Sequence, residues 1–248
     1  MNWTATELGE LAQQFESRST EEVLRWGVDT FFPKIGLASS FGAEDVALIH
    51  LLVQINPSVT VFTLDTGRLP EETYHLMDQL REKYHIQITS YFPNTQAVQQ
   101  LEREKGFYSF RQSVENRKEC CAIRKVEPLS RALSGLDAWI TGLRREQAVT
   151  RKVLPKVELD TAHQNIVKIN PMADWTTEKV WDFIRRTKIP YNRLHDMNYP
   201  SIGCAPCTRA IQPGEDIRAG RWWWELPEQK ECGLHIKPKS AFNKEEGT

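Results

Sequence analysis

The order of its apolar runs is the feature that most constrains how this chain can fold. Short strand-like runs at residues 35–39, 59–64, 86–92, 138–141 and 166–169 alternate with stretches of helical periodicity. Strands separated by helices form βαβ units, whose strands run parallel in one sheet with helices packed on both faces. We therefore predict an α/β fold, with a Rossmann-like and mostly parallel sheet.

The expected helices lie between these strands. Their ranges are two helices within 5–30, then 43–54, a helix from about 70, 95–105, 120–134 and 176–188. From Tyr191 onward the chain is rich in proline, glycine, tryptophan and charge, and it has no persistent period. We expect this irregular C-terminal segment to lie across the edge of the sheet where ligands bind.

Composition excludes several classes of protein. The chain has 248 residues, of which 40% are hydrophobic, enough for one domain with a sizeable core. A net charge of -1 argues against a nucleic-acid or membrane-surface binder. The N-terminus lacks the basic start and the apolar run that a secretory signal needs. The longest apolar stretch, 46–55, is too short to span a bilayer. We expect a cytoplasmic protein whose thiols stay reduced.

Five cysteines stand as a vicinal pair, Cys120-Cys121, a C-x-x-C pair, Cys204 and Cys207, and the single Cys232. In a reducing compartment they are better interpreted as ligands or nucleophiles than as disulfides. A C-x-x-C pair offers two thiolates from one turn, and a vicinal pair can fill two corners of an iron–sulfur cube where the backbone turns. The spacing also allows a redox dithiol, a structural zinc site or cysteines that are simply buried.

Two polar loops follow the first two strands. The serines, glycine and free N–H groups of residues 39–45, which open a helix, suit an anionic oxygen, and residues 64–68 suit a ribose or base. In a doubly wound sheet, ligands bind beyond the carboxyl ends of such strands. Neither loop matches the P-loop or the dinucleotide fingerprint, and an ordinary helix cap explains each loop about as well.

Basic residues accompany the segments that carry cysteines. In a regular helix Lys125 lies one turn after Cys121 on the same face, where it would face a negative cluster and any bound anion. Arg218 and Arg221 follow the C-x-x-C pair along the chain. For any one of these residues, a solvated charged surface is the simpler interpretation.

Cys232 stands three residues before His235 and next to a glycine. A nucleophilic cysteine must be partly exposed and must reach its thiolate, which nearby cations favour. His235, Arg218 and Arg221 could supply those cations, whereas Glu231 would oppose them. Spacing alone leaves an inert fifth cysteine as the default.

Taken together, these motifs resemble the assimilatory adenylyl-sulfate reductases, which are relatives of the phosphoadenylyl-sulfate reductases with an adenine nucleotide alpha-hydrolase-like fold. The resemblance runs from about Leu37 to His235. The motifs, in order, are SSFGAED at 39–45, LDTGRLPEETY at 64–74, CCAIRKVEPL at 120–129, TGLRREQ at 141–147, GCAPCTR at 203–209, RAGRWWWE at 218–225 and KECGLH at 230–235.

The resemblance implies reduction of adenylyl sulfate to sulfite and AMP, in sulfate assimilation and cysteine biosynthesis. It implies that Cys232 is the nucleophile, which forms a thiosulfonate. The expected ligands of a [4Fe–4S] cluster, which would polarise and position rather than donate electrons, are Cys120, Cys121, Cys204 and Cys207.

The same resemblance implies a set of substrate-binding residues. Lys125, Arg218, Arg221 and His235 would bind the phosphosulfate group. The residues expected to hold the rest of the substrate are Ser39, Ser40, Gly42, Leu64, Asp65, Thr66, Gly67, Gly142 and Arg151.

With four thiolates bound to a cluster, Cys232 would have no resolving thiol in the chain, so an external dithiol must cleave the thiosulfonate. Thioredoxin is the expected partner. Because Cys232 must then meet both a buried substrate and a protein, we expect a nucleotide- and cluster-binding domain at 1–209 and a mobile segment at 210–248 that carries the thiol.

Three other functions remain open at this point. The nearest is a phosphoadenylyl-sulfate reductase, or an enzyme that accepts both substrates. The others are a zinc-containing nucleotide-binding module and an ATP pyrophosphatase, although the first loop departs from the SGGxDS pattern of the pyrophosphatases. The sequence carries no signal of oligomeric state.

Overall fold

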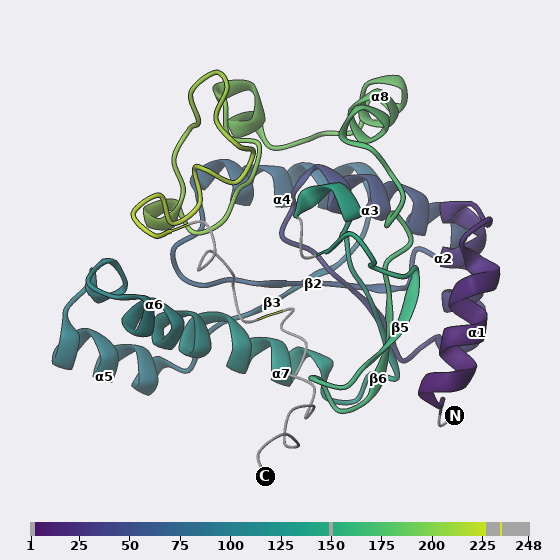
Figure 1. Cartoon of the computed structure of the whole chain (residues 1–248), viewed down its shortest axis with the longest axis horizontal. Coiled ribbons are helices and arrows are strands. Elements are labelled where there is room, and N and C mark those ends of the chain that lie inside the picture. The colour runs from purple at the N-terminus through teal and green to yellow at the C-terminus, as the bar shows by residue number, and fades with distance from the viewer. Residues whose placement is uncertain (1–2, 149–150, 227–233, 235–248) are drawn as a thin grey trace, which may run out of the picture.

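The computed structural model describes residues 3–148, 151–226 and 234, and it contains one six-stranded sheet (Figure 1). The strands lie in the order β3-β2-β1-β4-β6-β5. Their bounds are β1 Ile35–Ala38, β2 Thr60–Leu64, β3 Ile88–Tyr91, β4 Ala138–Ile140, β5 Val157–Asp160 and β6 Ile166–Ile169.

The five expected strands are all present, and they pair in parallel. The sixth strand, β5, was not predicted, and it pairs antiparallel with β6 at the edge of the sheet. Strand β1 lies between β2 and β4. The chain adds β2 and β3 on one side of β1, and it then crosses to the other side to add β4, β5 and β6. The carboxyl ends of β1 and β4 therefore flank the switch point where ligands bind in such sheets.

Helices cover both faces of the sheet, as predicted (Figure 1). The helices in the first 105 residues are α1 Ala5–Phe15, α2 Thr20–Phe31, α3 Ala43–Ile55, α4 Glu71–Tyr84 and α5 Thr95–Lys105. The later ones are α6 Val114–Cys121, α7 Glu127–Leu133 and α8 Thr177–Thr187. None of the described helices is both long enough and apolar enough to cross a membrane.

The largest core lies between one face of the sheet and helices α1 to α4 and α8. Helix α3 is buried on nearly every side, which explains why its sequence is apolar rather than amphipathic. On the other face, Leu129 and Leu133 of α7 pack against Phe62 and Trp139 of the sheet. Each such buried apolar side chain stabilises the fold by about 1.5–3 kcal/mol. These two layers hold the carboxyl ends of the central strands in fixed positions.

The helical stretch that carries the vicinal cysteines begins earlier than predicted. Helix α6 begins at Val114, and Cys120 and Cys121 form its last residues. A wide π-helical turn, η2 Ala122–Val126, then joins α6 to α7. The backbone thus departs from regular α-helix directly after the cysteine pair, so a spacing of four residues no longer returns to the same face.

The segment after Tyr191 is irregular, as expected, through Leu226. Its only described helical turns are η5 Arg193–Met197 and η6 Ala205–Cys207. A short antiparallel contact joins Thr208 to Arg221, and the Trp222 N–H donates to the Cys207 carbonyl at 3.1 Å. These bonds cross the expected boundary after residue 209. The division of the chain there stays a prediction.

Candidate active site

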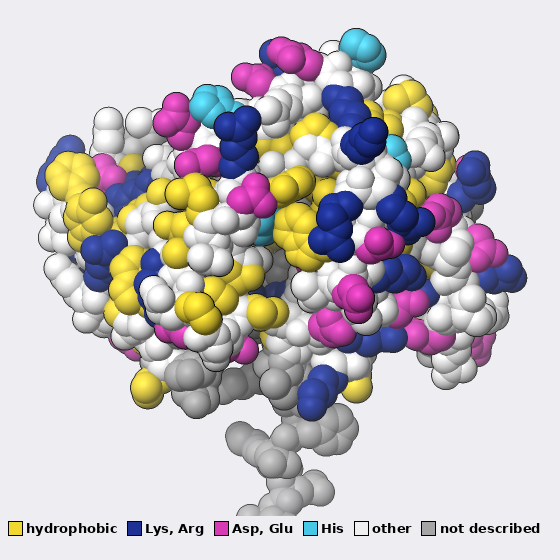
Figure 2. Space-filling model, turned by 90° about the horizontal axis from the view of Figure 1, so that it is seen from above, with side chains coloured by type: hydrophobic (Ala, Val, Ile, Leu, Met, Phe, Trp, Pro, Cys, Tyr) yellow, Lys and Arg dark blue, Asp and Glu magenta, His cyan; other side chains and the backbone are white. Residues whose placement is uncertain are grey.

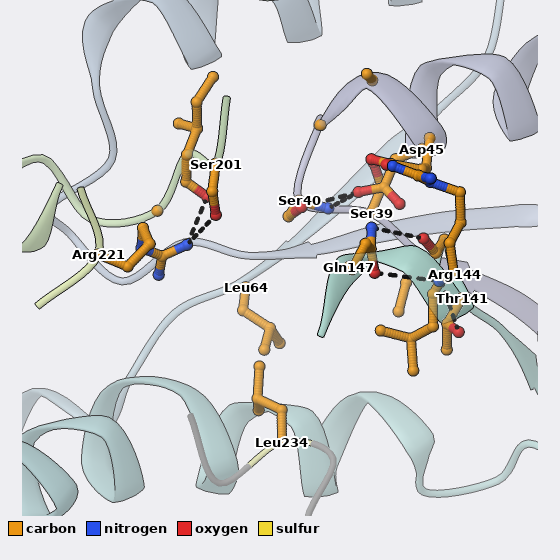
Figure 3. A pocket seen from close by; sticks show the side chains of 18 of the residues that line it. Ser39, Ser40, Asp45, Leu64, Thr141, Arg144, Gln147, Ser201, Arg221 and Leu234 are labelled. Atoms are coloured by element: carbon orange, nitrogen blue, oxygen red, sulfur yellow. Dashed lines mark hydrogen bonds and ion pairs between the residues drawn. The ribbon is translucent and has the colours of Figure 1, made fainter. Parts of the chain in front are cut away.

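A pocket of about 330 Å³ opens at the carboxyl ends of β1, β2 and β4, at the switch point of the sheet (Figure 3). Its volume is in the range of small-molecule sites. Among the residues expected from sequence to bind substrate, those that line it are Ser39, Ser40, Gly42, Leu64, Thr66, Lys125, Gly142, Arg151, Arg218 and Arg221.

Two expected residues lie behind the wall of the pocket rather than on it. The Asp65 carboxylate is buried and accepts hydrogen bonds from the Tyr74 hydroxyl and from the Gly67 N–H, both at 2.9 Å. Gly67 has a φ of 69°, which favours glycine. Asp65 and Gly67 therefore shape the loop that presents Leu64 and Thr66. Cys232 and His235 lie outside the described residues.

One end of the pocket is built around Asp45, which the sequence analysis did not single out. Its Oδ2 accepts hydrogen bonds from the Ser40 N–H at 2.6 Å and the Ser40 hydroxyl at 2.9 Å (Figure 3). Burial, aided by the charge of Glu44, raises the pKa of Asp45 to about 6. A Cβ at Gly142 would collide with the Asp45 carboxylate, so only glycine fits there. The glycine of the TGLRREQ motif thus brings two loops together.

Arg144 and Gln147 extend this end of the pocket. The buried Arg144 guanidinium donates from Nε to Glu44 at 2.7 Å and from Nη1 to the Trp175 carbonyl at 3.0 Å. The Gln147 side-chain oxygen accepts from Arg151 Nη1 at 2.6 Å. Arg151 is thereby placed on the pocket wall. The charges of this end are therefore largely paired with one another.

The opposite end of the pocket is cationic. Lys125, Arg218 and Arg221 line it, next to Cys204. Arg221 is buried, and its Nη1 donates to the Ser201 hydroxyl at 3.3 Å and to the Ile202 carbonyl at 3.1 Å (Figure 3). Both of these contacts hold the Arg221 guanidinium at the wall of the pocket, where a cation can bind an anion.

The four cysteines among the described residues meet in one place. Cys120, Cys121, Cys204 and Cys207 are all buried in a cluster that includes Phe110, Leu101 and Trp222. They line a small second cavity together with the cations Arg68, Arg117, Arg124 and Lys125. The loop of η6 is held there because the Ala205 N–H donates to the Arg68 carbonyl at 2.8 Å, and the Thr66 hydroxyl lies 3.3 Å from Cys204 Sγ.

The two cavities share a wall. Among the described residues, three line both cavities: Lys125, Cys204 and Trp222. A charge bound among the cysteines would therefore act directly on a ligand bound at the cationic end of the pocket. Of these three residues, the sequence analysis expected only Lys125 to face both the cysteines and a bound anion. It expected Lys125 in a regular helix, whereas the residue lies in the π-helical turn η2.

The environment of the cysteines suits a thiolate-bound anionic group. Burial raises the pKa of Cys207 to about 12, and burial also raises the pKa of Cys120, so bare thiols there would stay protonated. The four surrounding cations would offset the charge of such a group, and the Arg124 Nε–H is buried with no acceptor among the described residues. No set of three or more His, Cys, Asp or Glu side chains within 3–148, 151–226 and 234 is already arranged as a metal site. The residue types and charges nevertheless fit a [4Fe–4S] cluster.

Two carboxylates hold the cations around the cysteines. Glu102 on α5 accepts from Arg124 Nη2 at 2.6 Å and from Arg68 Nη2 at 3.1 Å. Glu225 accepts from Arg117 Nε at 2.9 Å and from its Nη2 at 2.8 Å. The second pair is almost fully buried and joins α6, which carries Cys120 and Cys121, to the chain that follows Cys207.

Comparisons with known proteins agree on one family. Residues 34–210 match the model of the phosphoadenosine phosphosulfate reductase domain. An adenosine 5'-phosphosulfate reductase of Allochromatium vinosum is 53% identical over 201 residues, which cover 81% of this chain and 78% of that protein. One of Burkholderia cepacia is 52% identical over 203 residues, 82% of this chain and 81% of that protein.

A solved structure supports the same conclusion about the fold. The phosphoadenylyl-sulfate reductase of Candida auris, a phosphate complex, superposes with a TM-score of 0.73 at 27% identity, and the match covers 85% of this chain and 99% of that one. The predicted adenine nucleotide alpha-hydrolase-like fold is thus confirmed.

Proposed function

The chain belongs to the phosphoadenosine phosphosulfate reductase family, and we propose that it reduces adenosine 5'-phosphosulfate to sulfite and AMP. The names of its relatives support this activity. The observation that carries the proposal is the wall that the cationic end of the pocket shares with the four cysteines. Such an arrangement suits an enzyme that transfers a sulfonyl group from a nucleotide.

The two ends of the pocket suit the two ends of this substrate. The polar loops after β1, β2 and β4, with Ser39, Leu64 and Gly142, would hold the adenosine. Lys125, Arg218 and Arg221 would bind the phosphosulfate, and His235 would join them. Cations fixed where negative charge develops stabilise the transition state without reorganisation, which is worth about 3 kcal/mol for a single donor.

In the first half-reaction, the Cys232 thiolate attacks the sulfur of the substrate. A bond forms between Cys232 Sγ and that sulfur, and the bond between the sulfur and the bridging phosphate oxygen breaks. AMP leaves with the electron pair, and Cys232 keeps the sulfonate as a thiosulfonate. Leu234, two residues after Cys232, lines the pocket and points toward Leu64 (Figure 3), which supports an approach of this segment.

We further propose that Cys120, Cys121, Cys204 and Cys207 hold a [4Fe–4S] cluster. When bound, it would supply a fixed charge that polarises the neighbouring substrate site. Lys125 lines both cavities and would orient the sulfonate oxygens at the attacked sulfur.

The second half-reaction needs a dithiol from outside the chain. A thiolate of that dithiol attacks Cys232 Sγ, and sulfite leaves with the electron pair of the sulfur–sulfur bond. The second thiolate then cleaves the mixed disulfide, which releases Cys232 and leaves the donor oxidised to its disulfide. Thioredoxin is the proposed donor, and the reducing cytoplasm is the proposed compartment.

The test is sulfite and AMP release from adenosine 5'-phosphosulfate with thioredoxin, using anaerobically purified protein and Cys232→Ser. We expect turnover by the wild type, none by the variant, and equal iron, sulfide and visible absorption in both. A parallel reaction with phosphoadenosine phosphosulfate distinguishes the related reductase or a dual-substrate enzyme. Sulfite release by Cys232→Ser would contradict the proposed nucleophile, and wild type that is inactive on both substrates would contradict the proposed function.

A further inference from the structure

An exposed aromatic surface lies beside the cysteine cavity, and the proposed chemistry does not use it. Its members are Phe107, 66% exposed, Tyr108, 59% exposed, Trp223, 37% exposed, and Leu226, 65% exposed. Figure 2 views the molecule from above. The half of this face that residues 200–226 partly form carries hydrophobic side chains with lysine or arginine between them. We call these four residues and Arg111 the aromatic surface.

Arg111 joins two separate loops within the aromatic surface. Its guanidinium carbon lies 5.1 Å from the centre of the Tyr108 ring and 5.3 Å from that of Trp223. Its Nη2 donates to the Pro206 carbonyl, between Cys204 and Cys207, at 3.0 Å. The Phe107 carbonyl in turn accepts from Arg68 Nη2 at 2.9 Å. Tyr108, Trp223 and Arg111 are therefore held together before any partner arrives, which lowers the entropic cost of binding.

Such residue types on a water-exposed face have a recognisable use. Trp, Tyr, Phe and Arg are enriched in the centres of protein interfaces, and Trp, Tyr and Arg dominate their binding energy. A fixed arginine between two exposed rings gives a partner both an apolar contact and hydrogen-bond donors. The aromatic surface therefore fits a protein partner better than a small molecule.

The chain itself indicates which partner would bind here. Leu226 is the last residue described before the segment that carries Cys232, six residues further on. A chain of six residues spans at most roughly 20 Å. A protein seated on the aromatic surface would therefore stand within the reach of the Cys232 thiol.

We propose that the aromatic surface docks the protein dithiol that releases sulfite from Cys232, which rests on the proposed function. The docked partner places one thiolate against Cys232 Sγ, and the bond from Cys232 to the sulfonate sulfur breaks as the mixed disulfide forms. Sulfite takes the electron pair, and the partner's second thiolate completes its own oxidation to a disulfide. Recognition is apolar and aromatic, so it suits a small protein with apolar residues around an exposed Cys-x-x-Cys.

The experiment compares Phe107→Glu and Tyr108→Glu with Phe32→Glu as a matched control. Phe32 is also an exposed aromatic residue, but it lies before β1, at the opposite end of the sheet. Three quantities are measured on the full, cluster-containing protein: the AMP burst without reductant, the KM for thioredoxin, and turnover with dithiothreitol in its place.

We expect each variant of the aromatic surface to raise the KM for thioredoxin roughly 10- to 30-fold, as the loss of an interface anchor does. The AMP burst and the turnover with dithiothreitol should match those of the wild type, and Phe32→Glu should change none of the three. The intact burst also establishes that the variants are folded.

Two outcomes would overturn the docking proposal alone. One is an unchanged KM for thioredoxin in both variants while the burst is normal. The other is a wild-type dimer that the variants convert to monomers, which would assign the aromatic surface to a second copy of this chain. A wild type without any AMP burst would overturn the proposed function and the docking proposal with it.

Discussion

The two ends of the pocket are constructed in different ways. At the Asp45 end, the contacts come from loops that directly follow β1 and β4, and the sheet between them fixes their spacing. The other end is the cationic end together with the adjoining cavity of the four cysteines, which we call the cysteine end, and its contacts come mainly from α6, the turn η2 and the irregular chain after residue 200. The sheet fixes the spacing of the first end, whereas the second end lies outside the sheet and is joined by the ion pairs of Glu102 and Glu225.

This difference indicates what each end tolerates. The Asp45 end is closely packed, so a single added atom at Gly142 would collide with its neighbours. The cysteine end concentrates like charges, so it depends on the carboxylates Glu102 and Glu225 that hold its cations. We therefore expect the cysteine end to fail when charge is removed and the Asp45 end to fail when volume is added.

The largest effect is expected from Glu225→Ala. It breaks the Arg117–Glu225 pair, whose side chains are only 1% and 3% exposed, and breaking a buried pair costs about 3–5 kcal/mol of stability. The control is Asp182→Ala, which removes an exposed pair with Arg186 and should cost well under about 1 kcal/mol. Urea unfolding of both variants measures the difference. A Glu225→Ala protein as stable as the control would show that the cysteine end is not held by this pair.

Next in size is Lys125→Gln, which removes a cation from the wall that the two cavities share. We expect kcat/KM for the proposed reaction to fall about 100-fold, or about 3 kcal/mol, with normal unfolding. The matched change is Lys179→Gln on α8, which removes an ammonium that lies over the Trp175 ring. Equal losses of activity in the two variants would argue against a specific role for Lys125.

Asp45 gives a pH test of the other end. Burial raises its folded-state pKa to about 6, from 3.8, so the folded protein holds its proton more tightly than the unfolded chain does. Its contribution to stability is therefore greatest below pH 4 and is lost as the pH rises through 6, by up to about 3 kcal/mol.

The measurement is the free energy of unfolding between pH 4 and 8 for the wild type and Asp45→Asn. Relative to the wild type, the variant should gain stability as the pH rises, because its amide does not ionise. A difference between the two proteins that does not vary with pH would show that Asp45 titrates normally.

The smallest effect is expected from Gly142→Ala. The added Cβ meets the Asp45 carboxylate and Glu44, and overpacking of this kind costs about 1–3 kcal/mol. Gly9→Ala is the control: it lies in α1 with no atom near the new methyl group, and should stabilise the protein by up to about 1 kcal/mol. The paired values come from thermal unfolding, with the KM for the nucleotide as a second readout. Opposite signs for the two alanines would support the contrast, and a neutral Gly142→Ala would contradict it.

Local patterns in the sequence were enough to predict the parallel sheet and the loops that line the pocket, because hydrophobic periodicity reports each strand and helix directly. The strand β5 was missed, since it is an edge strand whose partially exposed residues carry little apolar signal. The turn at η2 was also missed, because its residues are ordinary helix formers and only the packing around the cysteines reveals it.

The site could be predicted only where a motif carries it. Cys120 and Cys204 belong to two motifs that the family resemblance brings together, and they lie in one cluster of the structure. Glu225 and Asp45 were missed because their roles depend on partners elsewhere in the fold, Arg117 in one case and Gly142 in the other. No local signal distinguishes such a carboxylate from one on a solvated surface. The roles of the individual binding residues stay predictions.

The pairing of Arg117 with Glu225 also has a consequence for the order of biosynthesis. The ribosome delivers Cys120 and Cys121 long before Cys204 and Cys207, with β4, β5, β6 and α8 in between. The ion pair that joins both halves needs residue 225. For the proposed cluster, a nascent chain therefore offers only Cys120 and Cys121 until residue 207 has been made, and the pair that joins the two halves only at residue 225, which favours insertion of the cluster after this region has been made.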